Sequence, residues 1–132
     1  MSYETSFASN LGLIIVEAHV VGPRGGSTGC FVLDTGATMT TITPQIADNV
    51  GYPPRSGLRR SRVRSAIGEE EGYLASVLEF TAFKVTKRSF VLHVFDLGYD
   101  EIDGLIGMNF LRHLNYEIRS AEGRILTEEI VS

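Results

Sequence analysis

The stretch Phe31-Val32-Leu33-Asp34-Thr35-Gly36-Ala37 is the most informative part of this sequence. Its apolar half predicts a buried β-strand that ends at Asp34, which would place one carboxylate at the mouth of a sheet. Gly36 lets the backbone turn sharply at that point, and the hydroxyls of Thr35 and Thr38 can hold the carboxylate or its neighbours. An ordinary turn after a strand also contains Asp and Gly, so the tripeptide Asp-Thr-Gly by itself leaves both interpretations open.

The rest of the chain shows mostly the patterns of β-strands and turns, and its 14 glycines favour a turn-rich β protein over a helical bundle. Two short helices are expected, one at 43–49 with Thr43 as N-cap and Pro44 in the first position, and one at 108–114. No linker, repeat or low-complexity segment divides the 132 residues, so we predict one all-β domain, residues 1–132, with one or two short helices. The expected strands are 11–21, 30–33, 62–67, 73–83, 89–95, 115–119 and 124–131.

Composition and charge narrow the classes of function. The net charge of −4 gives no general case for binding nucleic acid or a membrane. The most apolar segment, 11–21, contains Glu17 and His19 and is too short to span a bilayer, and the N-terminus lacks a signal-peptide pattern. Cys30 is the only cysteine, so no intramolecular disulfide can form, which fits a reducing compartment. We therefore expect a soluble cytoplasmic protein in which Cys30, within an apolar run, is a buried structural thiol.

Two further features of the sequence combine with Asp34. The stretch Asp103-Gly104-Leu105-Ile106-Gly107-Met108-Asn109 places two apolar residues and a glycine before a helix, and a glycine-bounded hairpin tip at 68–72 lies between the two motifs. This order resembles the retroviral-type, or retropepsin-like, aspartic peptidases over residues 11–127. In that family the strand with Asp-Thr-Gly is threaded by an apolar-apolar-Gly segment, and a hairpin flap closes over the substrate. The resemblance implies a closed β-barrel of the acid protease fold.

The resemblance also implies peptide-bond hydrolysis. Aspartic peptidases need two carboxylates that share one proton, one acting as base on a water and the other donating to the scissile carbonyl. The sequence has a single Asp-Thr-Gly, so the second carboxylate would be Asp34 of another copy in a two-fold homodimer. Thr35 would exchange hydrogen bonds with the equivalent strand of the other copy and brace the pair. Gly36 would accept from a substrate backbone N–H or shape the floor of the site. The segments 1–8 and 125–131 would supply strands to the sheet between subunits, and no metal or cofactor is implied.

By the same resemblance, a second group of residues would contact a peptide substrate. Thr38 stands where the retroviral enzymes often carry an acidic residue, and the hairpin tip is acidic where theirs is glycine-rich and apolar. The glutamates at 69–71 could select basic substrates or make closure of the flap depend on pH. The alternative is a solvated hairpin tip that needs charged residues only to stay soluble. Tyr73 could cover the substrate or pack within a strand. The expected substrate contacts are Ala37, Thr38, Ile67, Gly68, Glu69, Glu70, Gly72, Tyr73, Leu105 and Ile106.

The remaining charged residues and histidines give weaker signals. Five arginines between 55 and 64 could bind nucleic acid or an acidic partner, but an exposed loop that offsets the nearby glutamates is the simpler interpretation. His19, His93 and His113 lack the spacing of metal ligands, and we expect His19 and His93 to be partly buried structural residues. Residues 22–29 lack the Lys-Ser/Thr of a phosphate-binding loop. The alternative to a peptidase is a dimeric binding or scaffold module that keeps the fold and hydrolyses little.

Overall fold

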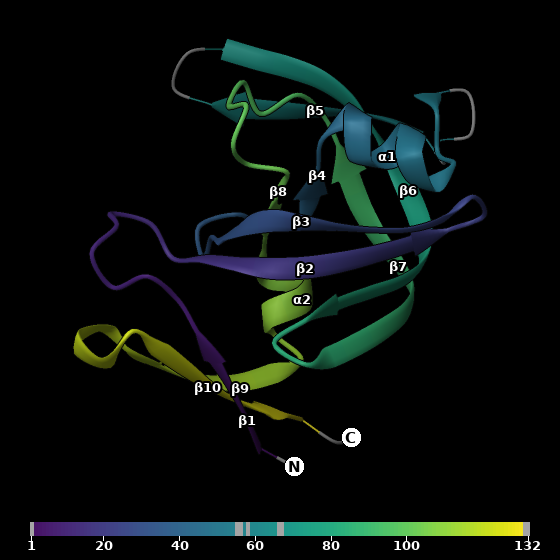
Figure 1. Cartoon of the computed structure of the whole chain (residues 1–132). Coiled ribbons are helices and arrows are strands. Elements are labelled where there is room, and N and C mark those ends of the chain that lie inside the picture. The colour runs from purple at the N-terminus through teal and green to yellow at the C-terminus, as the bar shows by residue number, and fades with distance from the viewer. Residues whose placement is uncertain (1, 55–56, 58, 66–67, 131–132) are drawn as a thin grey trace.

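The computed structural model describes residues 2–54, 57, 59–65 and 68–130, and it consists mostly of strands (Figure 1). Among these residues, no helix is long and apolar enough to cross a membrane. The expected class, all-β with two short α-helices, is confirmed. The elements in chain order are β1 (Ser2–Ser6), β2 (Ile15–Gly22), β3 (Gly25–Leu33), β4 (Thr41–Ile42), α1 (Pro44–Val50), β5 (Arg59–Ser65), β6 (Gly68–Ala82), β7 (Val85–Val94), β8 (Gly104–Ile106), α2 (Met108–Leu111), β9 (Leu114–Arg119), the 3₁₀ helix η2 (Ser120–Glu122) and β10 (Arg124–Glu129).

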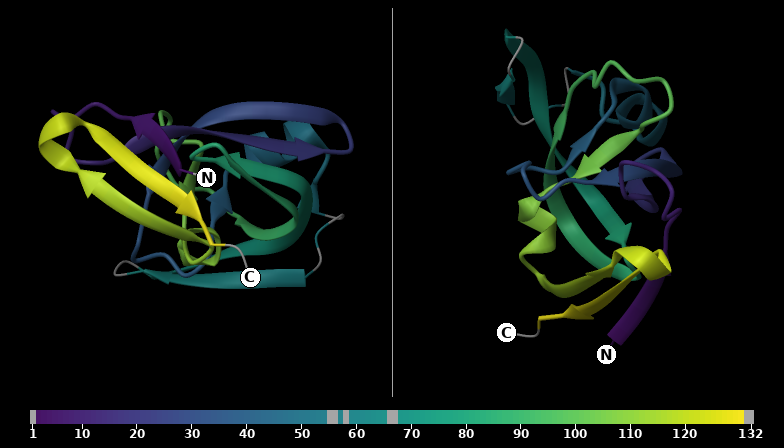
Figure 2. Two further views of the ribbon diagram at one scale, coloured as in Figure 1. Left: turned by 90° about the horizontal axis from the view of Figure 1, so that it is seen from below. Right: turned by 90° about the vertical axis from the view of Figure 1, so that its left-hand side faces the viewer.

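Six of the strands close into a barrel. Their hydrogen-bonded order is β2-β3-β8-β4-β7-β6, and β6 pairs again with β2, so the ring closes on itself. β3 runs parallel to β8 and β4 runs parallel to β7, whereas the other neighbours in the ring are antiparallel. A separate three-stranded sheet, β1-β10-β9, lies beside both termini and away from the β5–β6 hairpin (Figures 1 and 2).

Alternation along the strands fills the interior of the barrel. In β2, the side chains of Val16, Ala18 and Val20 are buried, whereas Glu17 and His19 between them are exposed. This period of two is the geometric consequence of an extended backbone, whose successive side chains point to opposite faces. The exposed position of His19 therefore contradicts the expectation that it is partly buried.

The same alternation corrects the expectation for Cys30. Its thiol is exposed, because the inward position in β3 belongs to the next residue, Phe31, which is fully buried. Phe31 packs edge-on against Phe80 at 5.7 Å between ring centroids, and Phe80 also contacts Phe90 and Phe110 at 5.3 and 5.2 Å. These four rings join β3, β6, β7 and α2 at the centre of the core.

The two α-helices follow their sequence signals to different extents. In α1, the Thr43 side chain caps the first turn, Pro44 occupies the first position, and Gly51 ends the helix with a left-handed φ of 103°. The helix expected at 43–49 is thus confirmed. The helix expected at 108–114 is shorter, because Leu114 already belongs to β9.

The β5–β6 hairpin differs from its expected form. Backbone pairing extends to Ser65 opposite Gly68, and residues 66–67 between them lie outside the described part of the chain. Residues 68–72 therefore belong to strand β6, and the prediction of a hairpin tip at 68–72 is wrong. The backbone register sets the acidic run 69–71 opposite residues 62–64 of β5. Because β6 first pairs with β7 at Tyr73, residues 68–72 extend beyond the barrel.

Candidate active site

Asp34 lies directly after the last residue of β3, where β3 and β8 run side by side. Leu33 pairs with Ile106 in this parallel ladder, and the Asp34 N–H extends it by donating to the Ile106 carbonyl at 3.0 Å. Two more hydrogen bonds close a tight turn: Asp34 Oδ1 accepts from the Gly36 N–H at 3.0 Å, and the Asp34 carbonyl accepts from the Ala37 N–H at 3.1 Å. These bonds fix the direction of the carboxylate.

The loop 34–40 presents this carboxylate at an open surface. Asp34 is half-buried, whereas Thr35, Gly36 and Thr38 are exposed. Among the described residues, only the Gly36 N–H donates to the Asp34 carboxylate. The carboxylate can therefore meet a water molecule, a peptide or a second protein chain.

Asn109, just inside α2, holds the far end of this loop. Its N–H donates to the Thr38 carbonyl at 3.0 Å, and its side-chain Oδ1 accepts from the Thr40 N–H at 2.7 Å. Its Nδ2 donates to the carbonyl of Val91 in β7 at 2.9 Å. One side chain thus ties the loop to both α2 and β7.

Gly107 lies against the same loop with no room for a side chain. A Cβ atom at Gly107 would lie 2.6 Å from the carbonyl carbon of Met39 and 2.9 Å from the carbonyl oxygen of Ala37. The Gly107 N–H donates to Oγ1 of Thr40 at 3.1 Å, and Thr40 is fully buried. Glycine is therefore required by close backbone approach at the point where the two motifs meet.

Tyr73, one of the expected substrate contacts, belongs to the core. Its side chain is only 8% exposed, and its hydroxyl donates to the Tyr52 carbonyl at 2.6 Å. Burial, together with the negative charge of Asp48, raises the pKa of the Tyr73 phenol. This geometry favours packing within the strand over contact with a substrate.

The other expected substrate contacts fall into two groups. Residues 34–38 lie together on one loop, and Leu105 is half-buried in β8 beside Val32 and Thr41, whereas the Ile106 side chain is fully buried in the core. The hairpin residues form the second group, on a separate element, and their contact with a substrate stays a prediction. Of these, Gly68, Glu69, Glu70 and Gly72 lie along β6, and Ile67 falls outside the described residues.

Thr40, Asn109 and Asp103 brace the site but were not among the residues predicted from the sequence. Asp103 Oδ2 accepts from the Cys30 N–H at 2.9 Å, and a Cβ at Gly29 would lie 2.8 Å from the same oxygen. Asp103 therefore joins β3 to the start of β8. Asp103 and Asn109 both flank the apolar segment 104–107 in the second motif, and that flanking position was the available signal.

The site offers the chemistry of a fixed carboxylate. Such a group can take a proton from a bound water, but acid catalysis at the same time needs a second proton-bearing group. Within the ranges that the structure describes, no three His, Cys, Asp or Glu side chains gather closely enough to hold a metal ion.

Comparison with known proteins agrees with this geometry. A family model described as aspartyl protease matches residues 16–110, a range that includes Asp34 and Gly107. The crystal structure of a retropepsin-like aspartic protease from Rickettsia conorii matches with a TM-score of 0.72 over 96% of this chain and 89% of that chain. At 18% sequence identity this likeness shows the fold, which is retropepsin-like, as the sequence predicted. No curated protein matches the chain significantly. Because the family model covers most of the sequence and both motifs, the chain belongs to the aspartyl protease family.

Proposed function

We propose that this protein is an aspartic endopeptidase whose active site forms when two copies of the chain meet. The observation that carries the proposal is Asp34, a carboxylate held by the Gly36 N–H at an open surface in a member of the aspartyl protease family. The sequence contains a single Asp-Thr-Gly. Since the chemistry needs two carboxylates that share one proton, a two-fold homodimer would bring the two Asp34 side chains together.

In the proposed reaction, one Asp34 is ionised and the other is protonated, because two like charges a few ångströms apart do not both ionise readily. The ionised carboxylate takes a proton from a water, whose oxygen attacks the scissile carbonyl carbon. The protonated carboxyl donates its proton to the carbonyl oxygen. The resulting tetrahedral diol collapses to a carboxylic acid and an amine, with no covalent enzyme intermediate.

The substrate would lie along the exposed residues beside Asp34. Thr35, Gly36 and Thr38 are exposed on the loop, and Leu105 is partly exposed in β8, the strand that pairs with β3. The β5–β6 hairpin extends beyond the barrel, and in the proposal it closes over the bound peptide. An extended peptide would then be held between the loop and the hairpin.

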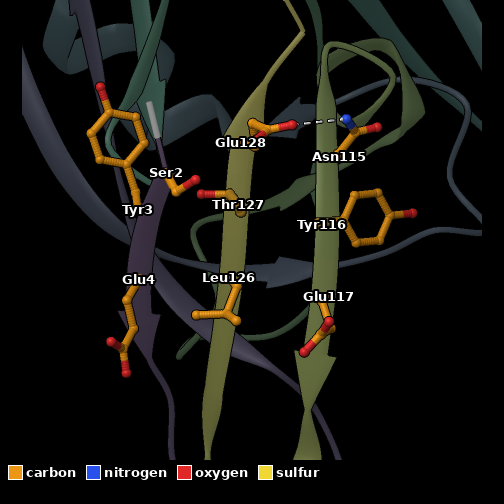
Figure 3. A pocket seen from close by; sticks show the side chains of 9 residues that line it. All are labelled: Ser2, Tyr3, Glu4, Asn115, Tyr116, Glu117, Leu126, Thr127 and Glu128. Carbon is orange, nitrogen blue, oxygen red and sulfur yellow. Dashed lines mark hydrogen bonds between the residues drawn. The ribbon is translucent and has the colours of Figure 1, made fainter.

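The three-stranded sheet is the proposed contact between the two copies. Its central strand is β10, and within the described chain β1 and β9 each pair with β10 alone, so each keeps an edge to which another strand can add. The outer face of this sheet is mostly polar. Figure 3 shows Leu126 there between Glu4 and Glu117. These two glutamates form ion pairs with Arg124 and Arg119, so the free strand edges are the contact that we propose.

The first test removes the acidic group of Asp34 while keeping its size. Asp34→Asn retains an oxygen that can accept from the Gly36 N–H, so the fold and the dimer are expected to remain. Cleavage of every library peptide that the wild type cuts, from acidic to neutral pH, is expected to be lost. Asp100→Asn, which changes an exposed carboxylate in another loop, is the matched control and should retain cleavage. Peptide cleavage by the Asp34→Asn variant would contradict the proposal.

A second test addresses the shared site. When wild type is mixed with Asp34→Asn chains, mixed dimers hold only one Asp34 carboxylate, so activity should fall with the square of the wild-type fraction. A linear fall, or a chain that stays monomeric in sedimentation at high concentration, contradicts a site shared between copies. A stable dimer that cuts no peptide would favour the binding or scaffold module.

A further inference from the structure

A hollow of about 470 Å³ between β7 and α2 is lined by four side chains that can carry positive charge. Lys87 and Arg88 come from β7, and Arg112 and His113 follow α2 directly. The two pairs face the same concavity from different elements.

Only part of this charge is neutralised. Lys87 Nζ lies 2.8 Å from Glu129 Oε2, a close ion pair. Arg88 Nε is 3.9 Å from Glu79 Oε1, and its side chain is 84% exposed, so this pair contributes little. Arg112 makes no ion pair within the described residues. The hollow therefore keeps an excess of positive charge.

The pKa of His113 depends on the charges around its ring. Burial lowers the pKa of its imidazole, and the positive charges of Lys87 and Arg112 lower it further, against the opposing effect of Glu129. Lys87 and Arg112 are thus close enough to act on the same ring. An anion in the hollow would offset this repulsion.

The hollow also adjoins the loop that carries Asp34. Met39 lies within the loop 34–40 and lines the hollow, as does Asn109, whose Oδ1 accepts from the Thr40 N–H. A group bound in the hollow would therefore lie beside the loop along which the substrate is proposed to bind.

We propose that this hollow is a subsite for an acidic side chain of the peptide substrate, several residues away from the scissile bond. The proposal rests on the proposed peptidase function. A carboxylate suits the site because guanidinium and ammonium groups are its strong hydrogen-bonding partners. A free oxyanion such as phosphate shares this chemistry, so the experiments must separate the two sources.

The first experiment measures substrate preference. Peptides that the wild type cuts are made in pairs with Glu or Gln at one position, for about five positions on each side of the scissile bond. At one position Glu should raise kcat/KM about fivefold over Gln at low salt. Arg112→Gln should bring this ratio close to one. Arg24→Gln, which removes the same charge from the exposed β2–β3 turn, should leave the ratio unchanged. The proposal is overturned if Glu and Gln give the same kcat/KM at every position, or if the Glu-to-Gln ratio falls equally in Arg112→Gln and Arg24→Gln.

The second experiment does not require cleavage. The Asp34→Asn protein is titrated with a Glu-containing peptide, with the matched peptide that carries Gln in its place, or with inorganic phosphate. NMR follows the His113 ring during each titration. The Glu-containing peptide should raise the pKa of His113, and the matched Gln-containing peptide should not. A response to phosphate alone shows a site for free anions and overturns the substrate assignment, and no response to any of the three overturns the subsite altogether. If the wild type cuts nothing, the proposed function fails while this titration still decides whether the subsite exists.

Discussion

The N–H of Asp34 donates to the carbonyl of Ile106 at 3.0 Å, and this bond joins two motifs that lie far apart in the sequence. Leu33 and Ile106 are paired immediately before it in the parallel β3–β8 ladder. Gly107 then packs against the loop that begins with Asp34. The position of the carboxylate is therefore set by the second motif as well as by its own turn.

Gly107→Ala should test this dependence directly. The added Cβ would meet the backbone of Met39 and Ala37, which cannot move without shifting the loop 34–40. We expect a loss of about 3 kcal/mol in the free energy of unfolding, measured by denaturant titration, and a fall in kcat of at least about tenfold. Gly12→Ala is the control, because a Cβ there meets nothing within 4 Å. If Gly107→Ala and Gly12→Ala have the same unfolding free energy and the same kcat, the close contact at Gly107 does not position the loop.

Thr40→Val should separate the bracing of the loop from general packing. Valine keeps the shape of the side chain but removes the buried oxygen that accepts from the Gly107 N–H. The unpaired N–H should reduce the free energy of unfolding by about 2 kcal/mol and lower kcat about tenfold.

The matched control for that variant is Thr127→Val. Thr127 is also buried, but it lies in β10, and its hydroxyl donates to the Phe83 carbonyl at 3.4 Å. Thr127→Val should lower the free energy of unfolding, while kcat stays within about twofold of wild type. A kcat that falls equally in both valine variants would argue against a specific role for Thr40.

Local patterns in the sequence were sufficient to predict the elements that carry the site. The apolar run before Asp34 predicted β3, Thr43 and Pro44 predicted α1, and the pair of motifs predicted the family. Each of these signals depends on neighbouring residues or on a spacing that the family preserves. They could therefore be recognised without knowing which strands pair.

Features that depend on pairing could not be predicted in this way. Asp103 braces Cys30 across two strands, and Thr40 accepts from Gly107, so neither role follows from nearby sequence. The hairpin was misplaced because glycines around the acidic run suggested a turn, whereas the register with β5 decides where the turn lies. Cys30 was misplaced because an apolar run does not show which alternate residue faces inward.

Tyr73→Phe should loosen the base of the hairpin without disturbing the core. The variant keeps the ring and removes only the hydroxyl that donates to the Tyr52 carbonyl at 2.6 Å. We expect a loss of about 1 kcal/mol in unfolding free energy and faster amide exchange in β5 and the first part of β6. Tyr99→Phe, at a position that is 70% exposed, should change neither quantity. Unchanged exchange in Tyr73→Phe would show that the hydroxyl does not restrain the hairpin.

His113 should make stability depend on pH. Because burial and the charges of Lys87 and Arg112 lower its pKa below 6.5, the folded protein resists a proton that the unfolded chain accepts. The contribution of neutral His113 to stability is therefore complete above about pH 6.5 and is lost as the pH falls through its lower folded pKa. Unfolding free energies measured between pH 8 and 5 should fall more steeply for wild type than for His113→Gln. Equal slopes, or an NMR titration of the His113 ring at or above pH 6.5, would contradict this expectation.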